Sequence, residues 1–183
     1  AVATTMAIND FVERHREDFK DYKIIAMHVH AGQAFHSHEP IRTVSDLKGT
    51  KIRTPTRTGA WLIEAMGATP IGAPVPKIPE MLSKKIVDSV MIPFEITLPL
   101  KVDEMVDYHT ILDDPVFTRI NTSTFMIVMN RGRYDSLPAD LRQVIDDHSG
   151  MHIARWLGEI WEAAELPGLK KAAASGEVIK MSS

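Results

Sequence analysis

The stretch VSDLKGTKIRTPTRTGAWLIEAMGATPIGAPVPKIPEMLSKKIVD, residues 44–88, alternates short β-rich runs with segments of helical spacing. It predicts strands at residues 51–54, 69–75 and 86–92, and helices between them at residues 58–66 and 76–83. Gly67 stands where glycine commonly ends a helix. Because strands that alternate with helices are typical of a parallel sheet covered by helices, the stretch predicts an α/β fold.

Longer elements are predicted on both sides of this stretch. An amphipathic helix is expected in the first 20 residues, and two long strands at residues 22–30 and 120–129. The remaining predictions are a helix from Pro93 to about Met105, an edge strand at 106–112, a helix from 137 to about 165 stopped by Pro167 and Gly168, and a last strand at 178–181. Two lobes are compatible with this order if the two long strands cross between them.

Composition excludes several classes of protein. The chain has 183 residues, 44% of them hydrophobic, and 21 Lys and Arg against 24 Asp and Glu, so its net charge of −3 makes nucleic acid an unfavourable partner. The absence of cysteine excludes disulfides, thiolate catalysis and cysteine zinc sites. The apolar runs fall far short of the ~20 residues of a membrane span. The first ten residues lack the pattern of a signal peptide, so we expect the sequence to start after a targeting segment or partway into a longer protein.

Histidines form the most conspicuous cluster in the sequence. His28, His30, His36 and His38 lie within eleven residues, and imidazole is a common ligand of transition metals. Residues two apart on a strand face the same side, so His28 and His30 could chelate one ion. A metal-binding protein or metal-dependent hydrolase is therefore one hypothesis. The alternative is that these histidines form local hydrogen bonds or line a pocket.

Arg53 and the segment Pro93-Phe94-Glu95 each follow a predicted strand. Ligands of open α/β sheets collect beyond the carboxyl ends of the strands, where a guanidinium can hold a carboxylate through two parallel hydrogen bonds. The alternatives are an Arg53 that forms a surface ion pair, a core Phe94, and a Glu95 that complements a helix N-terminus. No GxSxG, P-loop or GxGxxG motif is present, so no catalytic residue is predicted.

The quoted stretch also resembles the extracytoplasmic solute-binding proteins of TRAP transporters, the DctP-like family. The resemblance continues through IPFE at 92–95, VDYHT at 106–110 and MNRGRYDSLPADLRQVIDDHSG at 129–150. Lys85 stands where the family commonly has glycine, and Phe94 where it more often has tryptophan.

This resemblance implies a periplasmic-binding-protein-like (venus flytrap) fold of two α/β lobes joined by crossing strands, incomplete here because the N-terminal part is missing. The implied segments are the end of lobe I with the first crossing strand (1–30), lobe II (31–117), the second crossing strand with the long helix (118–165), and the start of a return to lobe II (166–183). The absence of that N-terminal part leaves one further alternative, an inert fragment with a half-built site.

The resemblance further implies a periplasmic protein, not an enzyme, that captures a small organic acid and delivers it to the membrane subunits of a TRAP permease. Arg53 occupies the position of the arginine that pairs with the ligand carboxylate. The full set of implied ligand-binding residues is Arg53, Phe94, Glu95, Pro93, Gln33, His36 and Thr56. No cofactor is implied, apart from a metal ion that bridges protein and ligand in some relatives.

Overall fold

The computed structural model describes residues 1–116 and 118–182 and divides the chain into two compact units. Unit 1 consists of Ala1–His30 and Ser123–Ala163, and unit 2 of Ala31–Thr122 and Ala164–Ser183. The chain thus leaves unit 1 twice and returns to it once. The sequence prediction placed the boundaries after residues 30, 117 and 165, and the structure places them after residues 30, 122 and 163.

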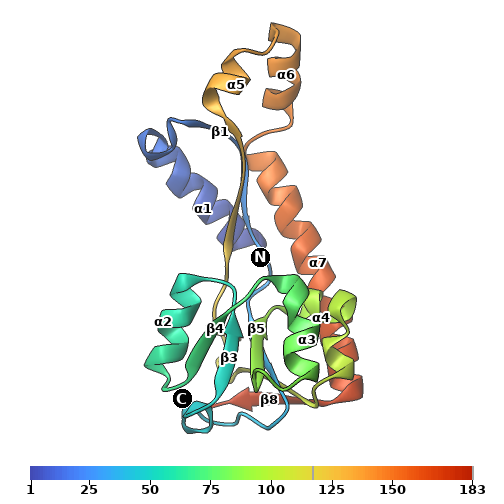
Figure 1. The fold of residues 1–183 in the computed structure, drawn as a ribbon. Helices are drawn as coiled ribbons and strands as arrows, with labels where there is room; N and C mark the ends of the chain where they lie inside the picture. The colour runs from blue at the N-terminus through green and yellow to red at the C-terminus, as the bar shows by residue number, and fades with distance from the viewer. Residues whose placement is uncertain (117, 183) are drawn as a thin grey trace. The chain divides into compact units, whose positions relative to one another are not determined.

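Unit 1 is built on a two-stranded antiparallel sheet, in which β1 pairs with β7 (Figure 1). Its elements are α1 (Val2–Arg14), a 3-10 helix (Arg16–Phe19), β1 (Tyr22–Val29), β7 (Thr124–Asn130), α5 (Arg131–Asp135), α6 (Ala139–Asp147) and the first half of α7 (Met151–Ser175). The register of the two strands shifts between Ile24 and Ala26. The amide of Asn9 on α1 fixes the helix to β1, since it donates to the carbonyl oxygen of Met27 at 2.7 Å and accepts from the Met27 N–H at 3.2 Å.

Unit 2 contains a six-stranded mixed sheet with the order β4-β3-β5-β2-β6-β8. Its strands are β2 (Ala34–Ser37), β3 (Lys51–Thr54), β4 (Thr69–Gly72), β5 (Ser89–Ile92), β6 (Tyr108–Leu112) and β8 (Glu177–Met181). Its helices are α2 (Arg57–Ala65), α3 (Ile78–Ser83), α4 (Phe94–Leu100), the end of α7, and three 3-10 turns at Val44–Leu47, Val75–Lys77 and Val102–Glu104. β3 is parallel to β4 and β5, whereas β2 is antiparallel to β5 and β6. The predicted α/β class is confirmed.

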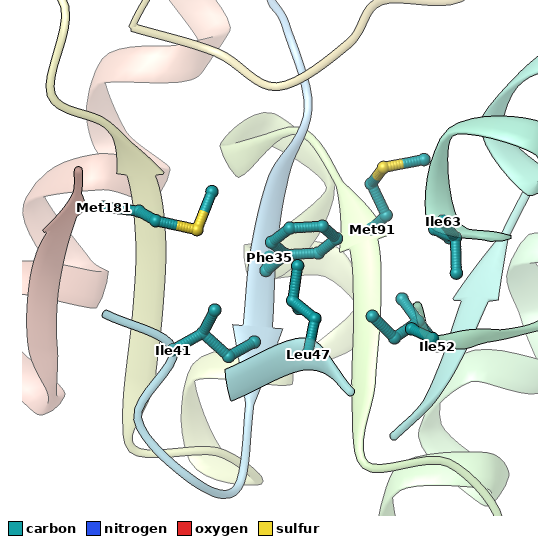
Figure 2. Packing of buried hydrophobic residues seen from close by; sticks show 8 residues of the cluster. Phe35, Ile41, Leu47, Ile52, Ile63, Met91 and Met181 are labelled. Atoms are coloured by element: carbon teal, nitrogen blue, oxygen red, sulfur yellow. The ribbon is translucent and has the colours of Figure 1, made fainter. Parts of the chain in front are cut away.

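One hydrophobic cluster of unit 2 fills the space between the sheet and its covering segments. Figure 2 shows Phe35 of β2 and Met91 of β5 surrounded by side chains from neighbouring elements. The buried members of this cluster are Phe35, Ile41, Leu47, Ile52, Ile63, Ala68, Met91 and Met181. Because the cluster joins four strands, α2 and the chain between β2 and β3, it holds these strands at fixed relative positions.

The structure differs from the sequence predictions at five places. The helix expected from Pro93 to about Met105 is shorter, because α4 ends at Leu100 and a separate 3-10 turn follows. β2 lies in a polar segment for which no strand was predicted, and β6 is not an edge strand, because β2 and β8 flank it. The helix expected from residue 137 to about 165 is two helices, interrupted between Asp147 and Met151. α7 then continues through Pro167 and Gly168, where a stop was expected.

The backbone at Lys85 has a conformation that glycine adopts more easily than lysine. Its φ of 51° lies in the left-handed region, where glycine carries no steric penalty. The turn between α3 and β5 thus keeps the backbone shape that favours glycine, although a lysine occupies it.

Candidate functional site

The candidate site lies at one edge of the sheet of unit 2. The parallel strands β3, β4 and β5 end there, after Thr54, Gly72 and Ile92. The antiparallel strand β2 begins at the same edge, because its first residue Ala34 pairs with Ile92. The predicted residues Arg53, Pro93 and Gln33 therefore belong to neighbouring strand ends, as the topology of α/β binding sites requires.

Arg53 is a buried guanidinium without an anionic partner among the described residues. The side chain is 1% exposed, and its Nε and Nη2 atoms donate to the carbonyl oxygen of Ala73 at 2.9 and 2.7 Å. Nη1 is buried and has no hydrogen-bond partner within residues 1–116 and 118–182. Burial lowers the pKa of Arg53 to about 10, which still leaves it charged at neutral pH. The alternative of a surface ion pair is therefore wrong.

Two threonines, Thr54 and Thr56, follow Arg53 and precede α2. Thr54 is 2% exposed, and its Oγ1 has no partner in the described part of the chain. A Cβ atom on Gly59 would overlap this Oγ1, so α2 is packed tightly against the end of β3. Thr56 is the N-cap of α2, since its Oγ1 accepts from the Gly59 N–H at 3.0 Å. The predicted residue Thr56 thus has a structural role as well as its position at the edge.

Pro93, Phe94 and Glu95 form the beginning of α4. Pro93 is the N-cap, while Phe94 is fully buried and Glu95 is 8% exposed. Both carboxyl oxygens of Glu95 are buried and have no hydrogen-bond donor among the described residues. Burial raises the pKa of Glu95 to about 8, so the carboxyl is mainly protonated at neutral pH. Such a carboxyl does not complement the N-terminus of α4 with a full negative charge.

Gln33 is tied to the segment that precedes β7. Its backbone N–H donates to the carbonyl oxygen of Asn121 at 2.6 Å, and its own carbonyl accepts from the Ile120 N–H at 2.9 Å. The side chain is 1% exposed. Gln33 therefore joins the start of β2 to residues 120–121 at the same edge of the sheet.

His36 forms a neutral hydrogen-bonded pair with His109 on the adjacent strand. The two Nδ1 atoms are 2.7 Å apart, and His36 Nε2 is 3.1 Å from the carbonyl oxygen of Ile92. Because a carbonyl can only accept, His36 carries its proton on Nε2, and His109 donates from Nδ1. Burial, followed by the neighbouring His109, lowers the pKa of His36 to about 3. Both ring nitrogens of His36 thus have hydrogen-bond partners within the protein, so we propose no hydrogen bond from this ring to a ligand.

The neutral pair gives a prediction for solution measurements. The ring of His36 should show the ¹⁵N shifts of a neutral Nε2–H imidazole throughout a titration from pH 8 to pH 5. Since His36 binds a proton near pH 6.5 in the unfolded chain but only near pH 3 in the folded protein, its contribution to stability is lost as the pH falls between these values. A His36 ring that titrates near pH 6.5 would contradict the assignment.

The metal-binding hypothesis is not supported. Within residues 1–116 and 118–182, no group of three His, Asp or Glu side chains is arranged to hold a metal ion. His38 Nε2 donates to the carbonyl oxygen of Leu82 at 3.1 Å. His28 stacks on Phe125 and Trp161, with ring centroids 5.2 and 5.8 Å apart. These histidines have packing and hydrogen-bonding roles, as the alternative interpretation proposed.

Two charged residues that the sequence did not single out lie beside α4. The carboxylate of Glu165 on α7 accepts from Arg119 Nε and Nη2 at 2.8 and 2.5 Å. The Arg119 guanidinium also lies 5.3 Å from the ring centre of Phe94. The two residues are 46 positions apart and belong to no motif, so only the tertiary structure brings them together.

In the described part of the chain, no helix combines the length and the apolar character needed to cross a membrane.

Solved structures of similar proteins share this fold. A TRAP solute-binding protein from a marine metagenome, described as specific for aromatic acid ligands and solved with metahydroxyphenylacetate, is 35% identical, with a TM-score of 0.91. The match covers 100% of this chain and 58% of that one. A TRAP solute-binding protein from Rhodoferax ferrireducens, solved with copurified benzoate, is also 35% identical at a TM-score of 0.91, with 100% and 57% of the two chains covered.

A third structure, a periplasmic TRAP solute-binding protein from Bordetella bronchiseptica, was solved with bound (R)- and (S)-mandelate. It is 25% identical, has a TM-score of 0.88, and is matched over 99% of this chain and 58% of its own. The chain therefore spans somewhat less than three fifths of the structures it resembles. The predicted fold, incomplete relative to these proteins, is confirmed.

The family comparison covers nearly the whole sequence. The model of the bacterial extracellular solute-binding proteins of family 7, named DctP, matches residues 3–183. The similar structures are all described as solute-binding proteins and not as enzymes. The chain belongs to the DctP family of bacterial extracellular solute-binding proteins.

Proposed function

We propose that this protein binds a small organic acid through its carboxylate at the sheet edge of unit 2. The observation that carries the proposal is the guanidinium of Arg53, which is 1% exposed and has one unpaired nitrogen, Nη1. A buried charge without a counter-ion is unfavourable, and a bound carboxylate would supply that charge together with the missing hydrogen-bond acceptor. An anion at this position would therefore provide both the counter-charge for Arg53 and a hydrogen-bond acceptor for its Nη1.

An aromatic monocarboxylate is the ligand class that we propose. The two structures at 35% identity are described with metahydroxyphenylacetate and benzoate, and both ligands carry one carboxylate on an aromatic body. The described part of this chain offers one buried guanidinium at the edge, which suits a single carboxylate. The proposed process is reversible binding, without a catalytic residue and without a cofactor.

The family membership supports the rest of the proposal. We propose that the protein works in the periplasm and hands its ligand to the membrane subunits of a TRAP permease. The family is described as extracellular, and the similar structures as TRAP solute-binding proteins.

Thermal melting with a panel of acids tests the proposed function. The protein at its natural length is melted with benzoate, 3-hydroxybenzoate, mandelate, succinate or glucuronate, each with and without EDTA. A ligand at 100 times its Kd stabilises a protein by about 2.7 kcal/mol, which raises the Tm of a domain of this size by about 5–10 °C. We expect this shift with an aromatic monocarboxylate, unchanged by EDTA. A folded protein whose Tm responds to none of these acids would contradict the proposal.

A further inference from the structure

A buried cluster of charged side chains lies around the start of α4, at the candidate site. Glu95 lies in the first turn of α4, Glu165 on α7, and Arg119 in the segment between β6 and β7. Glu95 is 8% exposed and Glu165 is 7% exposed. Three segments that are distant in the sequence thus bring two carboxyls and one guanidinium into a region that is largely buried from solvent.

The hydrogen bonds of Arg119 all go to groups other than Glu95. Its Nε and Nη2 atoms donate to Oε1 of Glu165, and Nη1 donates to the carbonyl oxygen and Oγ1 of Thr118 at 3.3 and 3.1 Å. The second carboxyl oxygen of Glu165, Oε2, is buried without a donor in the described part of the chain, as are both oxygens of Glu95. Arg119 therefore compensates the charge of Glu165, and Glu95 has no cationic hydrogen-bond partner among the described residues.

Contacts between α7 and α4 bring Glu165 and Glu95 together, because Gly168 of α7 packs against the backbone of Phe94, and the Arg119 that binds Glu165 lies over the Phe94 ring. The side chains of Glu95 and Glu165 interact in this cluster. Two ionised carboxylates cannot form a hydrogen bond with each other, because neither has a proton to donate. Burial is the main cause that raises the pKa of Glu95 to about 8, and the neighbouring Glu165 raises it as well, while the Glu95 backbone N–H and Arg119 oppose the rise only in part. The raised pKa of Glu95 and the unpaired oxygens of both carboxyls favour one proton within the pair at neutral pH.

We propose that Glu95 and Glu165 share one proton, which Glu95 donates to Oε2 of Glu165, so that the sheet edge carries a neutral carboxylic acid beside the Arg53 strand. Glu165 and Arg119 act as positioning residues, because Arg119 holds the carboxylate of Glu165 in place and Glu165 accepts the proposed hydrogen bond from Glu95. The consequence for the ligand rests on the proposed function. A neutral Glu95 does not repel a bound carboxylate, whereas an ionised Glu95 would.

The other titratable groups near α4 leave the charge of the cluster unchanged. His36 on β2 and His109 on β6 lie 4.9 and 6.1 Å from the Phe94 ring, measured between ring centroids. Burial lowers the pKa of both imidazoles, so both are neutral above pH 7. Lys171 on α7 lies 3.8 Å from Asp103, which compensates its charge. A change of charge in the cluster between pH 7 and pH 9 therefore comes from the Glu95–Glu165 pair.

The pH dependence of stability without ligand tests the shared proton. In the unfolded chain Glu95 loses its proton near pH 4.5, but in the folded protein only near pH 8. The wild-type protein consequently loses stability over this range, and Glu95→Gln removes that loss. We expect the ratio of the unfolding constants of wild type and E95Q to rise with pH, by at most tenfold per unit, and to level off above pH 8. Glu64→Gln, on the exposed face of α2, is the control for removing a carboxyl charge.

A wild-type to E95Q ratio that stays constant from pH 5 to pH 9 would overturn the shared proton. If E95Q does not fold, ¹³C NMR of the wild-type glutamate carboxyls gives the same information. One carboxyl should titrate near pH 8, and its midpoint should move to lower pH in Glu165→Gln. Titration of all glutamates near pH 4.5 would contradict the proposal.

The pH profile of ligand affinity tests the functional consequence. Above pH 8, the affinity of the wild-type protein for benzoate should fall by up to tenfold per pH unit, because Glu95 becomes ionised. In E95Q the affinity should be independent of pH between 7 and 9.5, whatever its absolute value. A wild-type affinity that does not change up to pH 9.5 would overturn this consequence. Complete absence of acid binding at every pH would instead contradict the proposed function, while the ligand-free experiments still decide the shared proton.

Discussion

Replacing Gly168 with alanine should lower the free energy of unfolding by about 2 kcal/mol or more. Gly168 lies inside α7, and a Cβ atom there would overlap the backbone carbonyl of Phe94 on α4. Overpacking costs about 1–3 kcal/mol and occasionally more, and we expect about 3 kcal/mol or more here, because backbone atoms cannot swing aside as a flexible side chain can. The higher helix propensity of alanine offsets about 1 kcal/mol of this cost.

Chemical denaturation of the wild-type and Gly168→Ala proteins measures this effect. Gly72→Ala is the matched control, because no atom lies within 4 Å of the position that its Cβ would occupy. We expect the control to differ from the wild type by less than about 0.5 kcal/mol. Equal stability of Gly168→Ala and Gly72→Ala would show that α7 and α4 do not approach each other as closely as the structure has them.

Replacing Arg53 with alanine should weaken the binding of the organic acid by about 10- to 100-fold or more. Each charge-assisted hydrogen bond contributes roughly 1.5–3 kcal/mol, and the substitution removes the donors that face the carboxylate. Arg53→Lys should also lose much of the affinity, since lysine lacks the planar pair of donors. Calorimetric titration of the three proteins with benzoate measures the change.

Arg53→Met separates binding from folding. A buried charge without a counter-ion is unfavourable, so an apolar side chain of similar volume can often replace it without loss of stability. We expect Arg53→Met to melt at or above the wild-type temperature in the absence of ligand and to bind benzoate as weakly as Arg53→Ala. If Arg53→Met binds with wild-type affinity, Arg53 is not the carboxylate-binding residue.

Local patterns predicted most of the elements of unit 2. β3, α2, β4 and α3 lie within the quoted stretch and β5 follows it directly, so that strands of four residues alternate with helices there. β2 was missed because Ala34–Ser37 is short and half polar, and it owes its place to pairing with β5 and β6. β6 was predicted as an edge strand, since nothing local shows that β8 will pair with it from 65 or more residues away.

The Pro167-Gly168 pair shows where a local rule fails for a tertiary reason. The pair predicts the end of a helix, but α7 continues, and the missing side chain of Gly168 makes room for the carbonyl of Phe94. The same limit applies to the site. Arg53 could be proposed from its place after a strand, whereas the contact of Arg119 with Glu165 depends on the packing of α7 and has no signal in the sequence.

The most direct test of carboxylate binding compares an acid with its uncharged amide. Titration of the wild-type protein with benzoate should give saturable binding, and titration with benzamide, which has the same shape and no charge, should give an affinity at least about tenfold lower. In Arg53→Met this difference should largely disappear. Equal affinities of the wild-type protein for benzoate and benzamide would contradict the account, because the Arg53 guanidinium would then not recognise the ligand by its negative charge.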